Sequence, residues 1–268
     1  MTATSTTATS TSVAERRTPP LGGFSVAILR LEVRRLLRNR RTMIFTLIAP
    51  VLFFLVFGLN AAYANKRAGH GNVSAFIMIS MALYGAVLAT TSGGAMVSVE
   101  RAQGWSRQLR ITPLSPVAYI AIKMLTSLVL GLASVLVVYA AGVIVGKPSM
   151  PIYLWVLTGA CVWIGSLLFA AFGLFVGYLL PSENVMQIIG FALMLFSFGG
   201  GLFIPLSQFS SGLRTAAELT PLYGLNELVH HPLVGGAFDW AWAANLMVWL
   251  AVFAGGAIWR FRRDTARV

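Results

Sequence analysis

Residues 117–146 read VAYIAIKMLTSLVLGLASVLVVYAAGVIVG, an apolar stretch in which Lys123 is the one charged side chain. An α-helix rises 1.5 Å per residue, so about 20 apolar residues cross the hydrocarbon core of a bilayer. This stretch is long enough to span a membrane while its single charge stays near one end. It predicts that the chain is an all-α integral membrane protein.

Apolar stretches of similar length lie on both sides of this one. Together they predict six transmembrane helices, at roughly 43–62, 74–98, 117–146, 152–180, 186–205 and 241–259. The composition agrees, because 57% of the 268 residues are hydrophobic and only 10% are charged, whereas a soluble domain is about 25% charged. Pro50 is expected to kink the first span. The spacing of Gly142 with Gly146, and of Gly173 with Gly177, favours close approach of helices.

The positive charges cluster beside the predicted spans. If both termini lie in the cytoplasm, 16 of the 20 Lys and Arg residues fall on the cytoplasmic side and the other four outside. Membrane proteins carry their excess of Lys and Arg in cytoplasmic segments, so the distribution predicts an N-in, C-in orientation. No basic soluble domain remains to bind nucleic acid, and no nucleic-acid partner is expected.

Two different segments precede the first span. Residues 1–22 are rich in Thr, Ser and Ala and have little to bury, which predicts a disordered tail. Residues 24–42 instead alternate at helical spacing between an apolar stripe and an arginine face of Arg30, Arg34, Arg38 and Arg41, and Arg35 belongs to the same predicted helix. This pattern indicates an amphipathic helix at the cytoplasmic interface of a lipid membrane, with the arginines toward anionic lipid.

Motifs for several kinds of chemistry are missing from the sequence. The string nearest to an ATP-binding loop, AGVIVGKP at 141–148, has Pro148 where a Ser or Thr must hold magnesium. His230 and His231 are adjacent, so they cannot act as paired ligands on one helical face, and we interpret them as exposed loop residues with no metal site. Glu100, Lys123 and Glu183 are placed at the ends of spans, which argues against an ion-coupled transporter. Asn72 begins a short match to a glycosylation sequon.

The segment between the second and third predicted spans carries a recognisable motif. Residues 99–116 read VERAQGWSRQLRITPLSP and resemble the cytoplasmic signature of the ABC-2 type permease family, E-x-E-x-G-T-x-E-x-L-x-x-T-P-L-S. The matching positions are Glu100, Gly104, Leu109, Thr112, Pro113, Leu114 and Ser115. Ala102, Trp105 and Arg107 depart from the signature.

The resemblance implies a fold and an activity. Residues 23–268 would form an ABC-2 type transmembrane domain, with an N-terminal elbow helix, a cytoplasmic coupling helix between spans two and three, and short re-entrant helices between spans five and six. The chain would not itself be an enzyme and would bind no cofactor. It would be the permease of an exporter in the cell membrane, pairing with a second permease and with an ABC ATPase subunit that binds ATP and Mg.

Two groups of residues would carry this function. The residues expected to couple the permease to the ATPase are Glu100, Arg101, Gly104, Trp105, Arg107, Gln108, Leu109, Thr112 and Pro113. The fifth span is rich in Phe, Met and Gly and suits a hydrophobic or amphipathic substrate such as a drug, an antibiotic or a lipid. Its expected pathway residues are Met186, Ile189, Phe191, Met194 and Phe198. Each of them, and Trp105, equally suits contact with lipid. A stand-alone transporter, pore or lipid-acting enzyme is the alternative.

Overall fold

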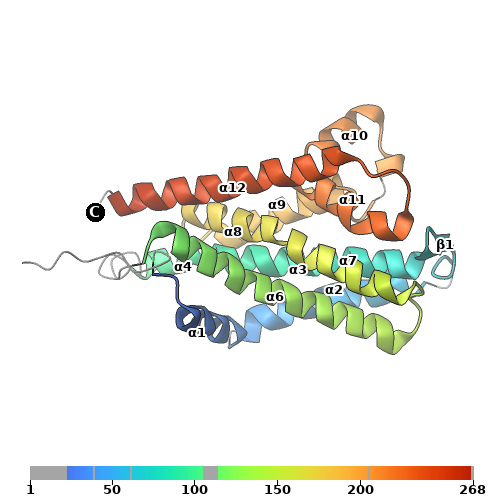
Figure 1. Cartoon of the computed structure of the whole chain (residues 1–268), viewed down its shortest axis with the longest axis horizontal. Coiled ribbons are helices and arrows are strands. Elements are labelled where there is room, and N and C mark those ends of the chain that lie inside the picture. Colours follow the sequence, from blue (N-terminus) through green and yellow to red (C-terminus); the bar gives the residue numbers. More distant parts are fainter. Residues whose placement is uncertain (1–22, 39, 61, 105–113, 205, 267–268) are drawn as a thin grey trace, which may run out of the picture.

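The computed structural model describes residues 23–38, 40–60, 62–104, 114–204 and 206–266 (Figure 1). The predicted disordered tail lies outside these residues. The described part is 79% helical with two very short strands, which confirms the all-α prediction. Its helices are α1 (Val26–Leu37), α2 (Arg40–Gly58), α3 (Val73–Ala95), α4 (Val97–Ala102), α6 (Pro116–Val145), α7 (Ile152–Gly165), α8 (Leu167–Leu179), α9 (Val185–Gly199), the 3-10 turn η2 (Leu206–Gln208), α10 (Ser211–Glu218), α11 (Pro221–Val234) and α12 (Trp240–Ala266). Two short antiparallel strands are β1 (Arg67–Ala68) and β2 (Gly71–Asn72).

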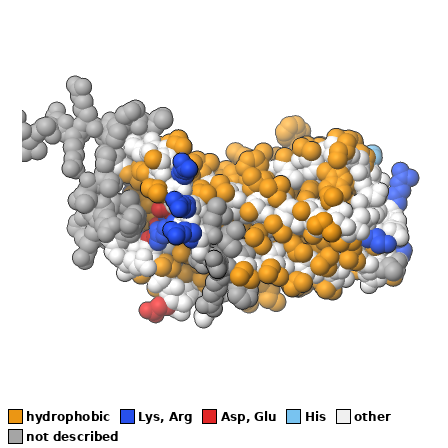
Figure 2. All heavy atoms as spheres, turned by 90° about the horizontal axis from the view of Figure 1, so that it is seen from below, with side chains coloured by type: hydrophobic (Ala, Val, Ile, Leu, Met, Phe, Trp, Pro, Cys, Tyr) orange, Lys and Arg blue, Asp and Glu red, His pale blue; other side chains and the backbone are white. Residues whose placement is uncertain are grey.

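Four stretches of helix are long and apolar enough to cross a membrane: Val73–Ala102, Val117–Val145, Ile152–Leu179 and Trp240–Arg263. They correspond to the second, third, fourth and sixth expected spans. Shorter apolar helices, Thr46–Gly58 and Val185–Gly199, stand where the first and fifth were expected. Figure 2 shows hydrophobic side chains over the middle of the visible face and Lys and Arg toward its two ends. This distribution matches a hydrocarbon layer with water on both sides.

Several predicted boundaries differ from the structure. The fifth span was expected to reach residue 205, but α9 ends at Gly199. Three glycines follow one another there, and Gly201 has φ +79°, a left-handed conformation that ends helices. The sequence between the fifth and sixth expected spans predicts two amphipathic pieces broken by Pro221 and Pro232, yet Pro221 begins α11 and Pro232 lies inside it. Pro232 falls in the last turn of that helix, so the backbone hydrogen bond that it cannot donate is lost close to the helix end.

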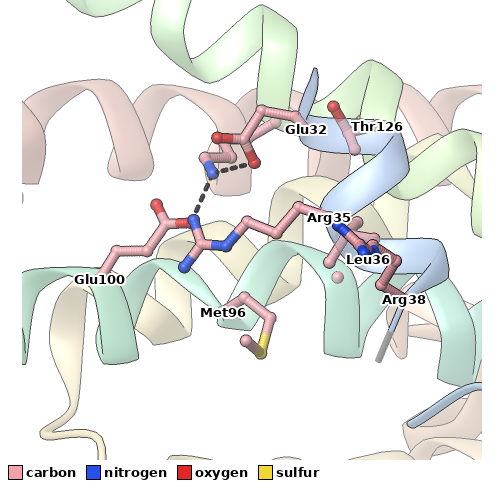
Figure 3. Close-up of a pocket in the computed structure, with 9 residues that line it drawn as sticks. Glu32, Arg35, Leu36, Arg38, Met96, Glu100 and Thr126 are labelled. Atoms are coloured by element: carbon pink, nitrogen blue, oxygen red, sulfur yellow. Dashed lines mark hydrogen bonds and ion pairs between the residues drawn. The ribbon is translucent and has the colours of Figure 1, made fainter. Parts of the chain in front are cut away.

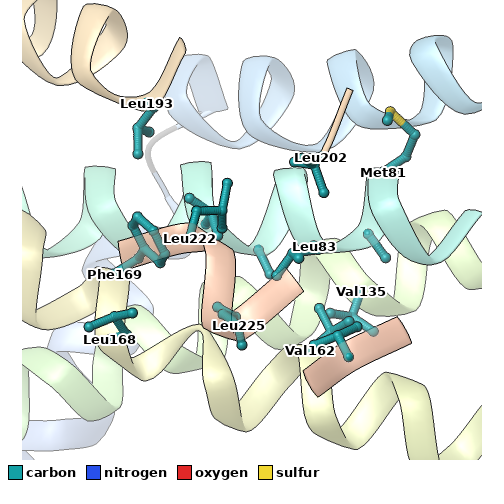
Figure 4. Packing of buried hydrophobic residues seen from close by; sticks show 14 of the residues in the cluster. Met81, Leu83, Val135, Val162, Leu168, Phe169, Leu193, Leu202, Leu222 and Leu225 are labelled. Carbon is teal, nitrogen blue, oxygen red and sulfur yellow. The ribbon is translucent and has the colours of Figure 1, made fainter. Parts of the chain in front are cut away.

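The core of the bundle surrounds α3, which packs against α2, α6 and α8. The buried residues labelled in Figure 4 come from six helices and from the segment after α9, and they interdigitate around the middle of α3. Leu83 on α3 and Phe169 on α8 are both fully buried, and Leu225 brings α11 into the same cluster. Close packing of this kind keeps the helices in one arrangement.

The contact between α3 and α8 depends on glycine. A side chain at Gly173 would overlap the backbone of Thr91, and one at Gly177 would meet the backbone of Ala95. The close approach predicted for this glycine pair is therefore confirmed. The other pair behaves differently, because Gly142 lies against the Met78 side chain and Gly146 ends α6 with φ +67°.

The bundle has two distinct ends (Figure 1). One end holds α1, α4 and the C-terminal part of α12, and the other holds the β hairpin, α10 and α11. Asn72 closes the hairpin end: its Oδ1 accepts from the N–H groups of Ala75 and Ser149, and its Nδ2 donates to the carbonyl of Lys147. Asn72 is therefore a helix cap and a bridge between segments. The side-chain amide of Asn72, the first residue of the sequon match, is therefore hydrogen-bonded within the protein.

Candidate functional site

A cluster of buried charges joins α1, α4 and α6 at the end of the bundle opposite the hairpin. Lys123 of α6 lies between two acids, with its Nζ 2.7 Å from Glu32 Oε2 and 2.6 Å from Glu100 Oε1. Arg35 Nη1 lies 2.9 Å from the same Glu100 oxygen. Figure 3 shows Arg35 extending from α1 toward Glu100, with Glu32 one turn away on the same helix.

Most of this cluster is shielded from solvent. Glu100 is 3% exposed and Lys123 is 4% exposed, whereas the Arg35 side chain is 45% exposed. The Tyr119 hydroxyl donates to Glu100 Oε2 at 2.7 Å, so both oxygens of this carboxylate have partners. Two acids and two bases cancel in charge. A buried charge is tolerated only when it is paired and hydrogen-bonded in this way.

Local sequence explains how these side chains meet. Ser115 caps α6 by accepting from the N–H of Ala118, and Pro116 occupies the first helical position. Tyr119 and Lys123 are then separated by four residues on one face of the helix. Glu32 and Arg35 are separated by three residues and share a face of α1. The two helices thus present three donors to Glu100, from Arg35, Lys123 and Tyr119, while Glu32 accepts from Lys123.

Arg101, next to Glu100, ties α4 to the end of α8. Its guanidinium donates to the carbonyls of Gly177 at 3.2 Å and Tyr178 at 2.8 Å, and lies 5.6 Å from the Tyr178 ring centroid. The Phe261 ring of α12 packs against the rings of Tyr119 and Tyr178, at 5.6 and 5.8 Å. Five helices therefore converge around Glu100 and Arg101, at the start of the 99–116 segment.

The structure describes three of the expected coupling residues. Glu100 and Arg101 have the intramolecular partners given above, and Gly104 has φ +77°, with no atom of the described residues within 4 Å of a Cβ added there. The other expected coupling residues lie outside the described residues: Trp105, Arg107, Gln108, Leu109, Thr112 and Pro113. Their contacts with an ATPase stay a prediction.

The elbow helix has one arginine directed into the cluster. Arg30, Arg34 and Arg38 are exposed, whereas Arg35 reaches Glu100. Sequence reasoning missed Glu32, Tyr119 and Lys123 as members of one site. It placed Glu100 and Lys123 separately at span ends, because a sequence shows no contact between residues that far apart. The available signal was that Glu100 and Lys123 are opposite charges at the ends of neighbouring apolar stretches. Charges in such positions need partners when they are buried.

A largely apolar groove of about 850 Å³ lies between α2, α3 and α9. Its walls include Phe53 and Phe57 from α2, Ser80 and Tyr84 from α3, and Met194 and Phe198 from α9. The last two belong to the expected substrate pathway. The other three expected pathway residues do not line the groove: Ile189 is 2% exposed in the core, and Met186 and Phe191 are exposed elsewhere on α9.

His230 is not the exposed loop residue that the sequence suggested. It is 4% exposed within α11, with its ring centroid 4.1 Å from that of Phe76. Its Nδ1 lies 2.9 Å from the Asn226 carbonyl oxygen, and its Nε2 lies 3.0 Å from Ser80 Oγ. Burial lowers the pKa of His230. The error arose because the polar pair His230–His231 was taken as a loop signal, although both residues lie within α11 and His230 is on the face of that helix that packs against α3.

Comparison with known proteins agrees with this architecture. The family described as "ABC-2 type transporter" matches residues 25–232. A relative from Bacillus subtilis (strain 168), named "Putative transport permease YvfS", is 26% identical over 226 residues, which cover 83% of this chain and 90% of the relative. The match includes the elbow helix, the charge cluster and the groove. The chain thus belongs to the ABC-2 type transporter family and is a multi-pass membrane subunit of an ABC transporter in the cell membrane.

Proposed function

We propose that this chain is the permease of an ATP-driven exporter that moves a hydrophobic or amphipathic substrate across the cytoplasmic membrane. ATP would be hydrolysed on a separate ABC ATPase subunit docked on the elbow helix and the 99–116 segment. The observation that carries the proposal is the buried bridge from Glu100, where that segment begins, to Lys123 on α6 and Arg35 on α1.

The bridge supports a mechanical role for the segment. Separating Glu100 from Lys123 would leave two charges in a site that is almost closed to water, which costs several kcal/mol. A displacement of the segment by the ATPase would therefore move α1, α4 and the start of α6 together. Arg101 extends the same body to α8 through the carbonyls of Gly177 and Tyr178.

The distribution of charge supports an arrangement of six spans with both ends in the cytoplasm. α2 and α9 would be the first and fifth spans, completing the four longer ones. The end of the bundle with the charge cluster also carries Arg260, Arg262 and Arg263 on the last part of α12. The hairpin end, with Lys66 and Arg67, would face outward. α10 and α11 would then dip into the outer leaflet as the re-entrant pair.

The groove supports a pathway for an apolar substrate. Apolar side chains of α2 and α9 also stay exposed outside the groove, including Leu52, Val56, Phe191 and Leu195. A second permease packed on this face would convert two open grooves into one enclosed path between the subunits. The groove lies in the hairpin half of the bundle, because its α3 residues fall between Val73 and Tyr84, so such a path would release substrate on the outer side.

The first experiment is affinity purification of the tagged full-length chain from its native host in mild detergent. We expect an equimolar soluble protein that carries a GxxxxGK[ST] loop to co-purify with it. Repeated recovery of the chain alone, still folded and active in transport, would favour a stand-alone transporter, pore or lipid-acting enzyme instead.

A paired substitution tests coupling within that complex. Gly104→Pro combined with Trp105→Ala should abolish ATP-driven transport, because proline fixes φ near −65° where the chain needs φ +77°. Gly236→Pro is the matched control, since Gly236 also has positive φ but lies beyond α11 at the hairpin end. Both variants should insert into the membrane at wild-type levels. Normal transport by the Gly104→Pro/Trp105→Ala variant would refute the coupling role.

A further inference from the structure

One wall of the groove contains a hydrogen-bonded pair that the transport proposal does not use. Ser80 of α3 lines the groove, and behind it Ser80 Oγ lies 3.0 Å from His230 Nε2 and 3.1 Å from the Phe76 carbonyl oxygen. His230 belongs to α11, so a residue 150 positions away in the sequence is in contact with the groove wall.

The Ser80 proton has a partner within the protein in either tautomer of His230. Both ring nitrogens face a carbonyl that can only accept: Nδ1 lies 2.9 Å from the Asn226 oxygen, and Nε2 lies 3.3 Å from the Phe76 oxygen. With the ring proton on Nδ1, the Ser80 hydroxyl donates to Nε2 or to the Phe76 carbonyl; with the proton on Nε2, the ring can donate to Ser80 Oγ, and the hydroxyl donates to the Phe76 carbonyl. In either case the single proton of Ser80 is used within the protein. The serine oxygen keeps a lone pair for a further donor.

We infer that Ser80 presents a fixed hydrogen-bond acceptor to the groove and that His230 is the positioning residue that holds it in that state. The inference rests on the proposed function of the groove as the substrate pathway. It narrows the substrate class to apolar or aromatic molecules that carry an O–H or N–H donor. A ligand of similar shape with only acceptor atoms would meet an oxygen lone pair at this position.

The apolar surroundings of the Ser80 hydroxyl increase its effect on which ligands bind. Phe53, Phe57, Phe76 and Met81 line the same groove, so a ligand there is largely removed from water. Its volume, about 850 Å³, lies in the usual range for small-molecule sites, about 300–1,000 Å³. In such surroundings a ligand binds less well if its O–H or N–H donor has no partner, and better if the donor can bond to Ser80.

The test measures binding of two matched probes to the full-length chain in lipid nanodiscs. 2-Naphthol has one O–H donor, and 2-methoxynaphthalene has the same ring system without it. The measured quantity is the ratio of their dissociation constants in the wild type divided by the same ratio in Ser80→Ala, so that differences in partition into lipid cancel. We expect 2-naphthol to be favoured by roughly 3- to 10-fold in this double ratio, as for one added hydrogen bond.

Ser74→Ala is the matched control. Ser74 is also a buried serine of α3, but it does not line the groove and its hydroxyl has no hydrogen-bond partner within the described residues. Its substitution should leave the probe ratio at the wild-type value. A shift as large as that of Ser80→Ala would point to a general effect on α3 and overturn the inference.

Two substitutions at His230 separate positioning from packing. Gln can place a polar atom where Nε2 lies, so His230→Gln should retain most of the preference for 2-naphthol. His230→Leu offers no hydrogen bond and should reduce it to the level of Ser80→Ala. Equal preference in both variants would show that His230 only fills space.

Failure of the inference can be distinguished from failure of the proposed function. Equal relative affinity of the two probes in the wild type and in Ser80→Ala, or no binding of either probe, would overturn the inference. Either result is compatible with an ATPase partner that co-purifies and drives transport. If no ATPase co-purifies but the 2-naphthol preference is retained, the proposed exporter function is refuted and the inferred acceptor site still stands.

Discussion

The Lys123 ammonium nitrogen lies 2.6 Å from a carboxylate oxygen of Glu100, and both residues are less than 5% exposed. This contact joins the end of the second long apolar stretch to the beginning of the third. It places a charged pair where the chain leaves the hydrophobic layer. The pair therefore stabilises the fold at the point where an ATPase is proposed to act.

Removal of the Lys123 charge should destabilise the protein strongly. Lys123→Met would leave Glu32 and Glu100 facing each other without their shared cation, and we expect a loss of about 3–5 kcal/mol in the free energy of unfolding. Thermal unfolding followed by tryptophan fluorescence in detergent measures it. Arg214→Met is the control, because its ion pair with Glu218 is exposed and is worth less than about 1 kcal/mol. Lys123→Met and Arg214→Met unfolding at the same temperature would contradict this role.

Glycine at 173 should be required for the α3–α8 contact. Gly173→Ala would force its Cβ into the backbone of Thr91, so we expect a cost of about 1–3 kcal/mol in the free energy of unfolding. Gly190→Ala on α9 is the matched control, because nothing lies within 4 Å of its added Cβ. Chemical denaturation in mixed micelles compares the two. Equal stability of the two variants would mean that α8 can move away from α3 without cost.

Stability should fall in mild acid because of His230. Burial lowers its pKa in the folded state, so the unfolded chain binds a proton first as the pH drops below about 6.5. The neutral ring contributes fully above that pH, and its contribution is lost as the pH falls toward the lowered folded pKa. Melting temperatures from pH 7.5 to 5 measure the effect, and His230→Gln should show a smaller decrease. An identical pH dependence in wild type and variant would exclude His230 as its source.

Two phenylalanines of α9 should differ in transport. Phe198 lines the groove, whereas Phe191 is 63% exposed outside it. Phe198→Ala removes a ring from the pathway, and we expect roughly tenfold weaker transport affinity for an aromatic substrate. Phe191→Ala should change it less than about twofold. Uptake into inverted vesicles with the ATPase present gives both values, and the reverse order would move the pathway about two turns along α9, toward its N-terminal end.

Local patterns in the sequence predicted the helices but not their tertiary contacts. Long apolar stretches depend on neighbouring residues alone, so α3, α6 and α12 were found near their observed positions, as was the amphipathic α1. The end of α9 was misplaced because the residues after Gly199 are still apolar, although the backbone is no longer helical there.

The site was less accessible to prediction. Glu100 was identified through the family signature, yet its partners Lys123 and Glu32 come from other helices. His230 was misassigned for the same reason, since Ser80 and Phe76 precede it by some 150 residues. Polar residues within apolar segments indicate that partners exist. Identifying those partners requires knowledge of which helices pack together.

Asn72 sets an order for the assembly of the chain. Its amide bonds reach Lys147 and Ser149, which are made only after α6. During synthesis, the hairpin between α2 and α3 therefore has no partner for these bonds until a further 75 residues have been added. Until then this end is held by local bonds, from the N–H groups of Val73 and Ser74 to the carbonyls of Lys66 and Ala64. A pause in translation before residue 147 would lengthen the period in which chaperones or membrane proteases can act on this nascent protein.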